Sequence, residues 1–224
     1  MAQEIILAGN AITAQILHSY LGSDPRYRVV GITVDDEFVS SGGVGDLPSA
    51  PMSGVVSVFP PDAARVVMAI GYNDLNKVRE SVFGRLKGMG YTIETYVHPQ
   101  ARVHSQFPLG EGSVVLPGAV IEPHVTVGAN AMVWCNVTLA HHCSVGEHCW
   151  IASGTVVSGQ ARILRNTFVG VNATIVNGIT VGEYNIIGAA ALVSKDTKPN
   201  SVHLARSAEP LRYSSDDYVK YFGV

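Results

Sequence analysis

The sequence has few of the features that mark secreted, membrane-bound or nucleic-acid-binding proteins. It contains only three cysteines, an odd number, so Cys135, Cys143 and Cys149 are expected to be reduced packing residues. No apolar run is long enough to span a bilayer, and the first residues lack the basic region that precedes a signal-peptide core. Charged residues make up 15% of the chain and the net charge is −3, which does not favour nucleic acid. These absences predict a cytoplasmic protein without a membrane span or a nucleic-acid partner.

A six-residue repeat fills the middle of the chain, where every sixth residue from Val103 to Val193 is aliphatic. A helix repeats its apolar face every 3.6 residues and a strand every 2, whereas a step of six suits short flat strands joined by tight corners, three to a triangular turn. One turn then takes eighteen residues. Small residues stand two positions before many of the aliphatic ones, and glycine often follows, where we expect corners with positive φ. These glycines are Gly110, Gly128, Gly146, Gly170, Gly182 and Gly188.

The residues before the repeat follow a βαβ pattern. Buried parallel strands are predicted at 4–8, 27–34, 55–59, 65–70 and 91–97, with helices at 12–21 and 74–87 and a Gly- and Ser-rich loop at 39–54. Asn73 is expected to cap the second helix. Asp35 and Asp36 follow the second strand, which places two carboxylates at the carboxyl edge of the sheet, where open α/β folds bind ligands.

The turn after the first strand is a weak ligand signal. A dinucleotide site would carry three glycines there, but only Gly9 is present, so the motif does not predict NAD or FAD. A single glycine before a helix can still serve one phosphate group through the free amides of the helix N-terminus. The alternative is a domain that only packs against the repeat.

Together, the small Rossmann-like domain and the unbroken hexapeptide coil resemble the hexapeptide-repeat nucleotide-sugar N-acetyltransferases of the PglD type, within the sialic-acid and bacillosamine O/N-acyltransferases. The resemblance implies a Rossmann-like nucleotide-sugar-binding domain at 1–98, an all-β left-handed parallel β-helix at 99–200, and a tail at 201–224. A cap at Ser214 and spaced aromatic residues predict a short C-terminal helix packed on the coil. Such enzymes form homotrimers that hold acetyl-CoA between subunits. They acetylate the amine of a UDP-, dTDP- or GDP-linked 4-amino-4,6-dideoxy sugar, for bacterial surface glycans.

The same resemblance suggests the binding residues. The nucleotide sugar would contact the first turn, the acid pair and the glycine after a hydrophobic strand, and the co-substrate acetyl-CoA would contact successive corners of the coil. The implied sugar contacts are Gly9, Asn10, Ala11, Thr13, Asp35, Asp36 and Gly71, and the implied acetyl-CoA contacts are Trp150, Gly170, Val171, Gly188 and Ala189. The first turn departs from the family, which usually has a second glycine and a histidine there.

His141 is the predicted catalytic base. An amine that attacks a thioester must lose a proton, and a neutral imidazole is the side chain best matched to that task near pH 7. The family places its base two residues after the aliphatic position, which is His141 after Leu139. That spacing puts the side chain at an outer corner of the coil, facing a neighbouring subunit. The next residue is usually a carboxylate but is His142 here, so we assign both histidines to the catalytic site.

Two other functions remain open from the sequence. The protein could be an O-acyltransferase on another small acceptor, which a comparison of amino and hydroxyl sugars would distinguish. It could instead be a metal-binding or non-catalytic trimer, because His124 and His142 are one turn apart and should stack at about 4.8 Å. Two such imidazoles could hold a metal with a third ligand from another subunit. No metal is expected, since the α/β domain would then lack a purpose.

Overall fold

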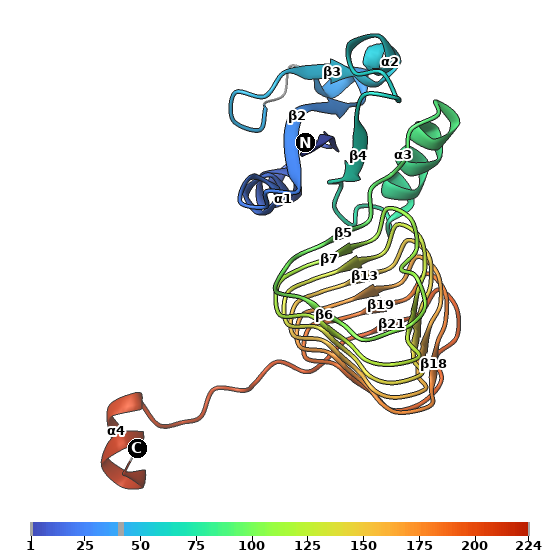
Figure 1. Ribbon diagram of the computed structural model, residues 1–224. Helices are drawn as coiled ribbons and strands as arrows, with labels where there is room; N and C mark the ends of the chain where they lie inside the picture. Colours follow the sequence, from blue (N-terminus) through green and yellow to red (C-terminus); the bar gives the residue numbers. More distant parts are fainter. Residues whose placement is uncertain (1, 40–42, 224) are drawn as a thin grey trace.

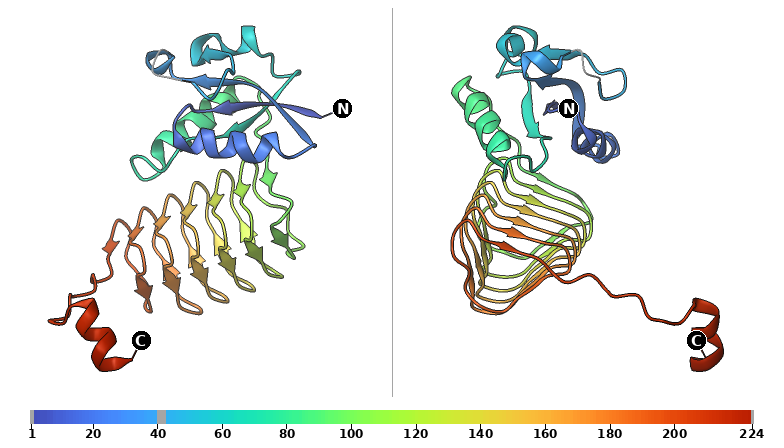
Figure 2. Two further views of the ribbon diagram at one scale, coloured as in Figure 1. Left: turned by 90° about the vertical axis from the view of Figure 1, so that its left-hand side faces the viewer. Right: turned by 180° about the vertical axis from the view of Figure 1, so that it is seen from behind.

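The computed structural model describes residues 2–39 and 43–223, so residues 40–42 of the predicted loop lie outside it. An N-terminal α/β domain sits on one side of a triangular coil, and a C-terminal arm leaves the opposite end of the coil (Figures 1 and 2). Within the described ranges, no helix is both long enough and apolar enough to cross a membrane.

The N-terminal domain is a parallel four-stranded sheet in the order β3-β2-β1-β4. Side chains alternate along β1, so Ile5 and Leu7 pack in the core shared with α1, while Ile6 and Ala8 pack in the core shared with α3. The sheet is therefore covered on both faces, as its continuous apolar strand predicted. The elements are β1 (Gln3–Ala8), α1 (Ile12–Gly22), β2 (Tyr27–Val34), η1 (Asp36–Phe38), β3 (Ser49–Pro51), η2 (Met52–Gly54), α2 (Val55–Val58), β4 (Arg65–Met68) and α3 (Lys77–Gly88).

Two predicted elements of this domain are wrong and a third is displaced. The predicted strand at 55–59 is the short helix α2, in which only Val55 is buried; β-branched residues favour a strand only where a sheet surface packs against them. Helix α3 begins at Lys77 and not at Asp74, since residues 74–76 are all left-handed, and Asn73 does not cap it. The predicted strand at 91–97 reduces to one bridge from Ile93 to Val66 and to β5 (Tyr96–Val97), which pairs with the coil.

The coil is a parallel β-helix of three sheets with an eighteen-residue turn. Met132 pairs with Trp150, and Trp150 with Phe168. Every sixth residue from Val115 to Val193 is at most 5% exposed, so the repeat lines the interior as predicted. The first sheet contains β5, β7 (Val114–Val115), β10 (Met132–Val133), β13 (Trp150–Ile151), β16 (Phe168–Val169), β19 (Ile186–Ile187) and β21 (Val202–His203). The second contains β6 (Arg102–Val103), β8 (Val120–Ile121), β11 (Thr138–Leu139), β14 (Val156–Val157), β17 (Thr174–Ile175) and β20 (Leu192–Val193), and the third β9 (Thr126–Val127), β12 (Ser144–Val145), β15 (Arg162–Ile163) and β18 (Thr180–Val181).

The corner glycines serve a purpose other than the predicted one. Positive φ angles recur three residues after the interior aliphatic, at positions such as Gly118, Asn136 and His142, and not directly after it. At Gly110, a Cβ would lie 2.3 Å from the backbone of Gly128 and of the residue after it. The glycines that follow the aliphatic residues therefore allow adjacent turns to approach closely, and the prediction of positive φ there was wrong.

The cysteines are packing groups of the coil. All three thiols are free, and Cys143 and Cys149 point into the interior. Burial raises the pKa of each of these two thiols to about 12, so neither forms a reactive thiolate near neutral pH.

The domain and the coil share a hydrophobic core and a polar network. Residues of α1 pack with Met132 and Trp150 on the outer face of the first sheet. Beside this core, the fully buried Arg79 of α3 donates to the carbonyls of Asn130, at 3.1 Å, and Ile70, at 3.1 Å. The Asn130 amide lies 2.9 Å from Nδ1 of His148, a residue that is 7% exposed. These contacts join the coil to the end of β4.

This network predicts a pH-dependent stability. Burial lowers the pKa of His148 below its usual value, and the nearby Glu80 opposes that shift only partly. As the pH falls through about 6.5, the unfolded chain takes up a proton on this residue before the folded chain does, so the free energy of unfolding decreases. We expect a lower Tm near pH 5.5 than near pH 8, and a smaller difference in His148→Gln. An equal pH dependence in both proteins would contradict this assignment.

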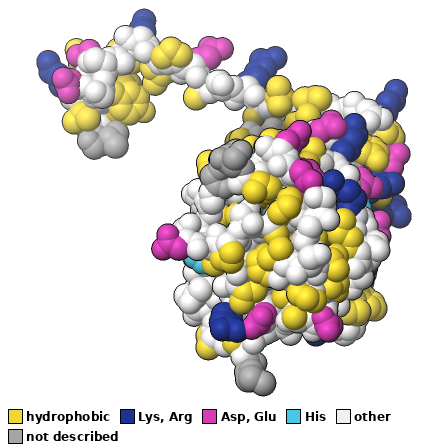
Figure 3. Space-filling view, turned by 90° about the horizontal axis from the view of Figure 1, so that it is seen from above, with side chains coloured by type: hydrophobic (Ala, Val, Ile, Leu, Met, Phe, Trp, Pro, Cys, Tyr) yellow, Lys and Arg dark blue, Asp and Glu magenta, His cyan; other side chains and the backbone are white. Residues whose placement is uncertain are grey.

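The C-terminal arm stands apart from the coil, which makes the predicted packing of its helix wrong. Helix α4 (Ser215–Phe222) is capped as predicted, by a bond from the amide of Asp217 to Ser214. Every described residue from 205 onward is exposed, and the rings of Tyr213, Tyr218 and Phe222 pack against one another. Figure 3 shows the arm, with several hydrophobic side chains, clear of the body.

Candidate functional site

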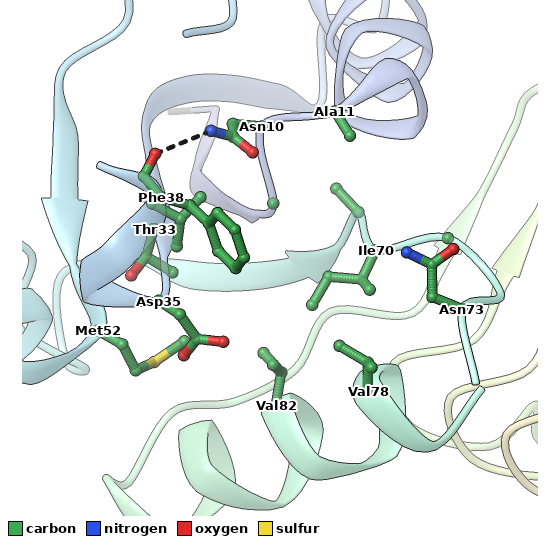
Figure 4. A pocket seen from close by; sticks show the side chains of 14 residues that line it. Asn10, Ala11, Thr33, Asp35, Phe38, Met52, Ile70, Asn73, Val78 and Val82 are labelled. Carbon is green, nitrogen blue, oxygen red and sulfur yellow. Dashed lines mark hydrogen bonds between the residues drawn. The ribbon is translucent and has the colours of Figure 1, made fainter. Parts of the chain in front are cut away.

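A cavity of about 310 Å³ opens at the carboxyl ends of β1, β2 and β4, where parallel α/β sheets bind ligands. Figure 4 shows Phe38, Ile70, Val78 and Val82 forming apolar walls, with Asp35 at one edge. Such a cavity suits a flat ring with a few polar groups. It is lined by Gly9, Asn10, Ala11, Thr33, Val34, Asp35, Phe38, Met52, Ala69, Ile70, Gly71, Asn73, Val78 and Val82.

The turn after β1 closes one side of the cavity. Gly9 has a φ of +129°, and a Cβ there would lie 2.8 Å from the carbonyl oxygen of Ala69. Only glycine allows this turn to approach the end of β4 so closely. The side-chain amide of Asn10 donates to the carbonyl of Phe38 at 3.3 Å, which joins this turn to the segment after β2 (Figure 4).

The two aspartates after β2 have different surroundings. Asp35 lines the cavity and accepts from Arg85 of α3 at 2.5 Å. Asp36 does not line it; this carboxylate accepts from the amide of Ser53 at 3.0 Å. Hydrogen bonding to the side chain of Ser53, and then to its backbone, lowers the pKa of Asp36. Asp35 can therefore contact a ligand directly, while Asp36 holds the η2 segment. Thr13 also lies outside the lining, near Gly71.

His141 and His142 lie at the corner between the second and third sheets, directly after β11 and before β12. Both side chains are exposed. The backbone of His142 is left-handed, with a φ of 61°, and the planes of the two imidazole rings make an angle of 81°. Their Nδ1 atoms are 3.3 Å apart, close enough for one ring to donate a hydrogen bond to the other. The amide of His141 donates to Glu122 at 2.7 Å, which fixes the corner one turn away.

The other edge of the His141 ring lies against Gly159, eighteen residues further on. A Cβ there would lie 2.6 Å from Cε1 and 2.8 Å from Nε2 of His141, and 3.0 Å from Oδ1 of Asn177, so only glycine leaves room for the ring in this position. His141 is exposed, and its Nδ1 is directed at His142. Nε2 is therefore the nitrogen of His141 that could take a proton from a substrate.

The stacked histidines are present as predicted. The ring centroids of His124 and His142 lie 4.5 Å apart, and the ring planes make an angle of 26°. Across residues 2–39 and 43–223, no three His, Cys, Asp or Glu side chains are grouped closely enough to hold a metal ion. A single chain therefore offers only two of the three ligands that the metal-binding alternative requires.

The residues suggested for acetyl-CoA fall in two places. Gly170 and Val171 form a corner between the first and second sheets, and a Cβ on Gly170 would lie 2.6 Å from the amide of Ala189, so Gly188 and Ala189 follow directly above. Trp150 is 4% exposed on the face toward the N-terminal domain, with its ring 5.2 Å from that of Tyr72. The corner residues form one column, and Trp150 is not part of it.

Residues 124–159 match the family described as bacterial transferase hexapeptide (six repeats). The matched segment is continuous with the eighteen-residue strand register found from β5 to β21. The coil of this chain is built from hexapeptide repeats similar to those of that family. No curated protein sequence matches it.

Solved structures share the whole architecture of this chain. The acetyltransferase domain of PglB from Neisseria gonorrhoeae FA1090, in complex with acetyl coenzyme A, is 22% identical, with a TM-score of 0.81 over 94% of this chain and 100% of that one. PerB from Caulobacter crescentus, in complex with CoA and GDP-perosamine, is 22% identical, with a TM-score of 0.78 over 92% of this chain and 95% of PerB. WeeI from Acinetobacter baumannii AYE is 19% identical, with a TM-score of 0.78 over 90% of this chain and 96% of WeeI.

Sequence reasoning missed one wall of the cavity in this protein. Val78 and Val82 come from α3, and Phe38 and Met52 from the short helices η1 and η2, while Arg85 of α3 reaches the cavity only through its contact with Asp35. The spacing of Val78, Val82 and Arg85 places them along one face of a helix, which was the available signal. The two short helices gave no such signal, because their positions depend on the chain's path between strands.

Proposed function

We propose that this protein is an acetyl-CoA-dependent N-acetyltransferase for the amine of a nucleotide-linked 4-amino-4,6-dideoxy sugar used in bacterial surface glycans. The observation that carries the proposal is His141, an exposed imidazole with Nδ1 directed at His142 and Nε2 beside Gly159. Support also comes from the fold shared with a domain solved with acetyl coenzyme A and with PerB, solved with CoA and GDP-perosamine.

The reaction follows from the chemistry of these groups. The sugar amine attacks the thioester carbonyl, the C–N bond forms, and Nε2 of His141 accepts the amine proton. The C–S bond then breaks, and the proton passes from His141 to the departing CoA sulfur. Because His141 is positively charged between the two transfers, an acceptor at its Nδ1 stabilises that state. We assign this role to the Nδ1 lone pair of His142, 3.3 Å away.

The nucleotide of the acceptor would bind in the cavity of the N-terminal domain. Its base would lie between the apolar walls, with its polar edge at Asp35, whose charge is partly balanced by Arg85. The sugar would extend past Gly71 and Tyr72 toward the coil. Val171 and Ala189 are the exposed members of the column of Gly170, Val171, Gly188 and Ala189, and they would contact the pantetheine arm of acetyl-CoA.

The cavity and His141 lie on different sides of the same chain. The domain covers the first sheet, containing β5 and β7, while His141 lies at the corner between the sheets of β6 and β18 (Figure 1). A site with both parts therefore needs His141 from one subunit and the cavity from another. We accordingly propose a homotrimer with parallel coils, in which each corner faces the domain of a neighbour.

The test is an acetyl-transfer assay with the full-length protein. We expect free thiol and acetylated product with acetyl-CoA and at least one UDP-, dTDP- or GDP-linked 4-amino sugar, and no product from the matching 4-hydroxy sugar. Light scattering should give the mass of a trimer. Coexpressed His141→Ala and Asp35→Lys chains, each inactive alone, should regain part of the activity in mixed trimers. Acetylation of only the hydroxyl sugar, or of no sugar tested, would refute the proposal.

A further inference from the structure

A column of three side chains leads along one corner of the coil to His141. Gln106, His124 and His142 stand eighteen residues apart on successive turns. Gln106 contacts the ring of His124, that ring stacks on His142, and His142 contacts His141. Phe107 lies beside His124, with their ring centroids 6.5 Å apart. The catalytic pair is thus the end of a longer series of contacts, and the proposed reaction assigns no role to its first two members.

The backbone fixes which atom of the Gln106 amide faces the ring. The amide N–H of His124 donates to Oε1 of Gln106 at 3.2 Å, and only the oxygen of the carboxamide can accept there. The side-chain nitrogen of Gln106 then contacts Nδ1 of His124. Nδ1 must accept this bond, so His124 carries its hydrogen on Nε2 and is neutral. A proton on Nδ1 would face another N–H donor.

We propose that Gln106 and His124 are positioning residues for the His141–His142 pair. Gln106 holds His124 neutral, and the stacked ring of His124 holds His142 with its Nδ1 lone pair toward the Nδ1–H of His141. This leaves the lone pair of His141 on Nε2, next to Gly159. The inference rests on the proposed function, since it assigns these residues to the orientation of the base in acetyl transfer.

The surrounding charge is consistent with a column of neutral rings. The carboxylate of Glu122 at this corner accepts from the backbone amide of His141. The rings of His124 and His142 are contacted by carboxamide and aromatic groups. Orientation of the base therefore depends on hydrogen-bond direction and ring stacking, which makes the amide of Gln106 an effective place to disturb it.

The first measurement reads protonation without any substrate. In full-length protein labelled with ¹⁵N-histidine, long-range ¹H–¹⁵N spectra at pH 8 should show the hydrogen of His124 on Nε2 and that of His141 on Nδ1. Gln106→Glu replaces the donor with a second acceptor, so a hydrogen should move to Nδ1 of His124. An unchanged His124 pattern in this variant would overturn the proposal, as would a wild-type His141 that carries its hydrogen on Nε2.

The second measurement is steady-state kinetics. We expect Gln106→Glu and His124→Asn to lower kcat by up to about 100-fold, the cost of a misplaced catalytic group, with little change in the KM of the nucleotide sugar. His124→Asn should fold, because asparagine has the same left-handed backbone at other corners, such as Asn136 and Asn172. Gln100→Glu is the matched control, adding the same charge at an exposed position near another corner, and should keep wild-type kcat.

These outcomes separate this inference from the proposed function. An active wild-type enzyme whose Gln106→Glu variant shifts the His124 hydrogen but keeps its kcat would overturn the positioning role alone. A wild-type protein that acetylates no amino sugar would overturn the proposed function, while the ¹⁵N spectra would still test the hydrogen-bond pattern of the column. A loss of kcat in Gln100→Glu equal to that in Gln106→Glu would show a general effect of charge and would also overturn the positioning role.

Discussion

His141→Ala is expected to lower kcat/KM for amino-sugar acetylation by about 10²–10⁴, the usual contribution of a well-placed general base. The reason is Nε2 of His141, the ring nitrogen that is not directed at His142, while the neighbouring side chain of Asn177 is a carboxamide and cannot act as a base. The loss should fall on kcat, because the cavity that would bind the nucleotide belongs to the N-terminal domain. Initial rates of thiol release at several sugar concentrations measure both constants.

The control for this prediction is the neighbouring histidine. His142→Ala should lower kcat/KM less than His141→Ala does, because His142 would stabilise the charged base without accepting the substrate proton itself. His18→Ala, in α1 of the N-terminal domain, should leave kcat unchanged. Equal losses of kcat/KM in His141→Ala and His142→Ala would mean that the two rings act as a unit or that His142 is the base. The assignment of roles within the pair would then be wrong.

Gly110→Ala is expected to give the largest loss of stability among single-methyl additions to the coil. The new Cβ would lie 2.3 Å from backbone atoms of the adjacent turn, and backbone on both sides has no flexible end that can move away. Overpacking of this kind costs about 1–3 kcal/mol and occasionally more. Chemical denaturation should show the decrease as a lower midpoint. An unchanged midpoint would contradict the close approach of the turns.

The matched control adds the same methyl group where space is open. Gly84 is inside α3, and nothing lies within 4 Å of a Cβ built on it. Gly84→Ala should raise the free energy of unfolding by up to about 1 kcal/mol, because alanine is the better helix former. Opposite signs for the two substitutions would show that contact with the next turn, and not the loss of glycine itself, determines the effect at position 110.

The coil could be predicted from sequence because its core repeats in register with the chain. Each interior position from Val115 to Val193 depends on the same local geometry, so the period alone identifies which residues are buried. The first strands of the N-terminal domain were equally clear, since their apolar runs are short and continuous. The predicted stack of His124 on His142 followed from the same eighteen-residue register.

Features that depend on contacts between distant segments could not be predicted in this way. The role of Gly110 is set by the backbone of the next turn, and the left-handed residues 74–76 that precede α3 include Leu75, whose carbonyl accepts from Asn166 of the coil. The different surroundings of Asp35 and Asp36 arise from Arg85 and Ser53, which are far away in sequence. Adjacent residues with the same side chain therefore looked equivalent until their partners were known.

The eighteen-residue turn also limits which changes of length the chain can accept without losing a working site. An insertion of six residues between β7 and β11 would keep every aliphatic side chain inside the coil, yet rotate all later corners by one side of the triangle. The histidine corner would then point toward a different neighbour. An insertion of eighteen residues would preserve its direction and move it along the coil axis by one strand spacing, about 4.8 Å. Rotational phase, and not chain length as such, is the quantity that a functional coil must conserve.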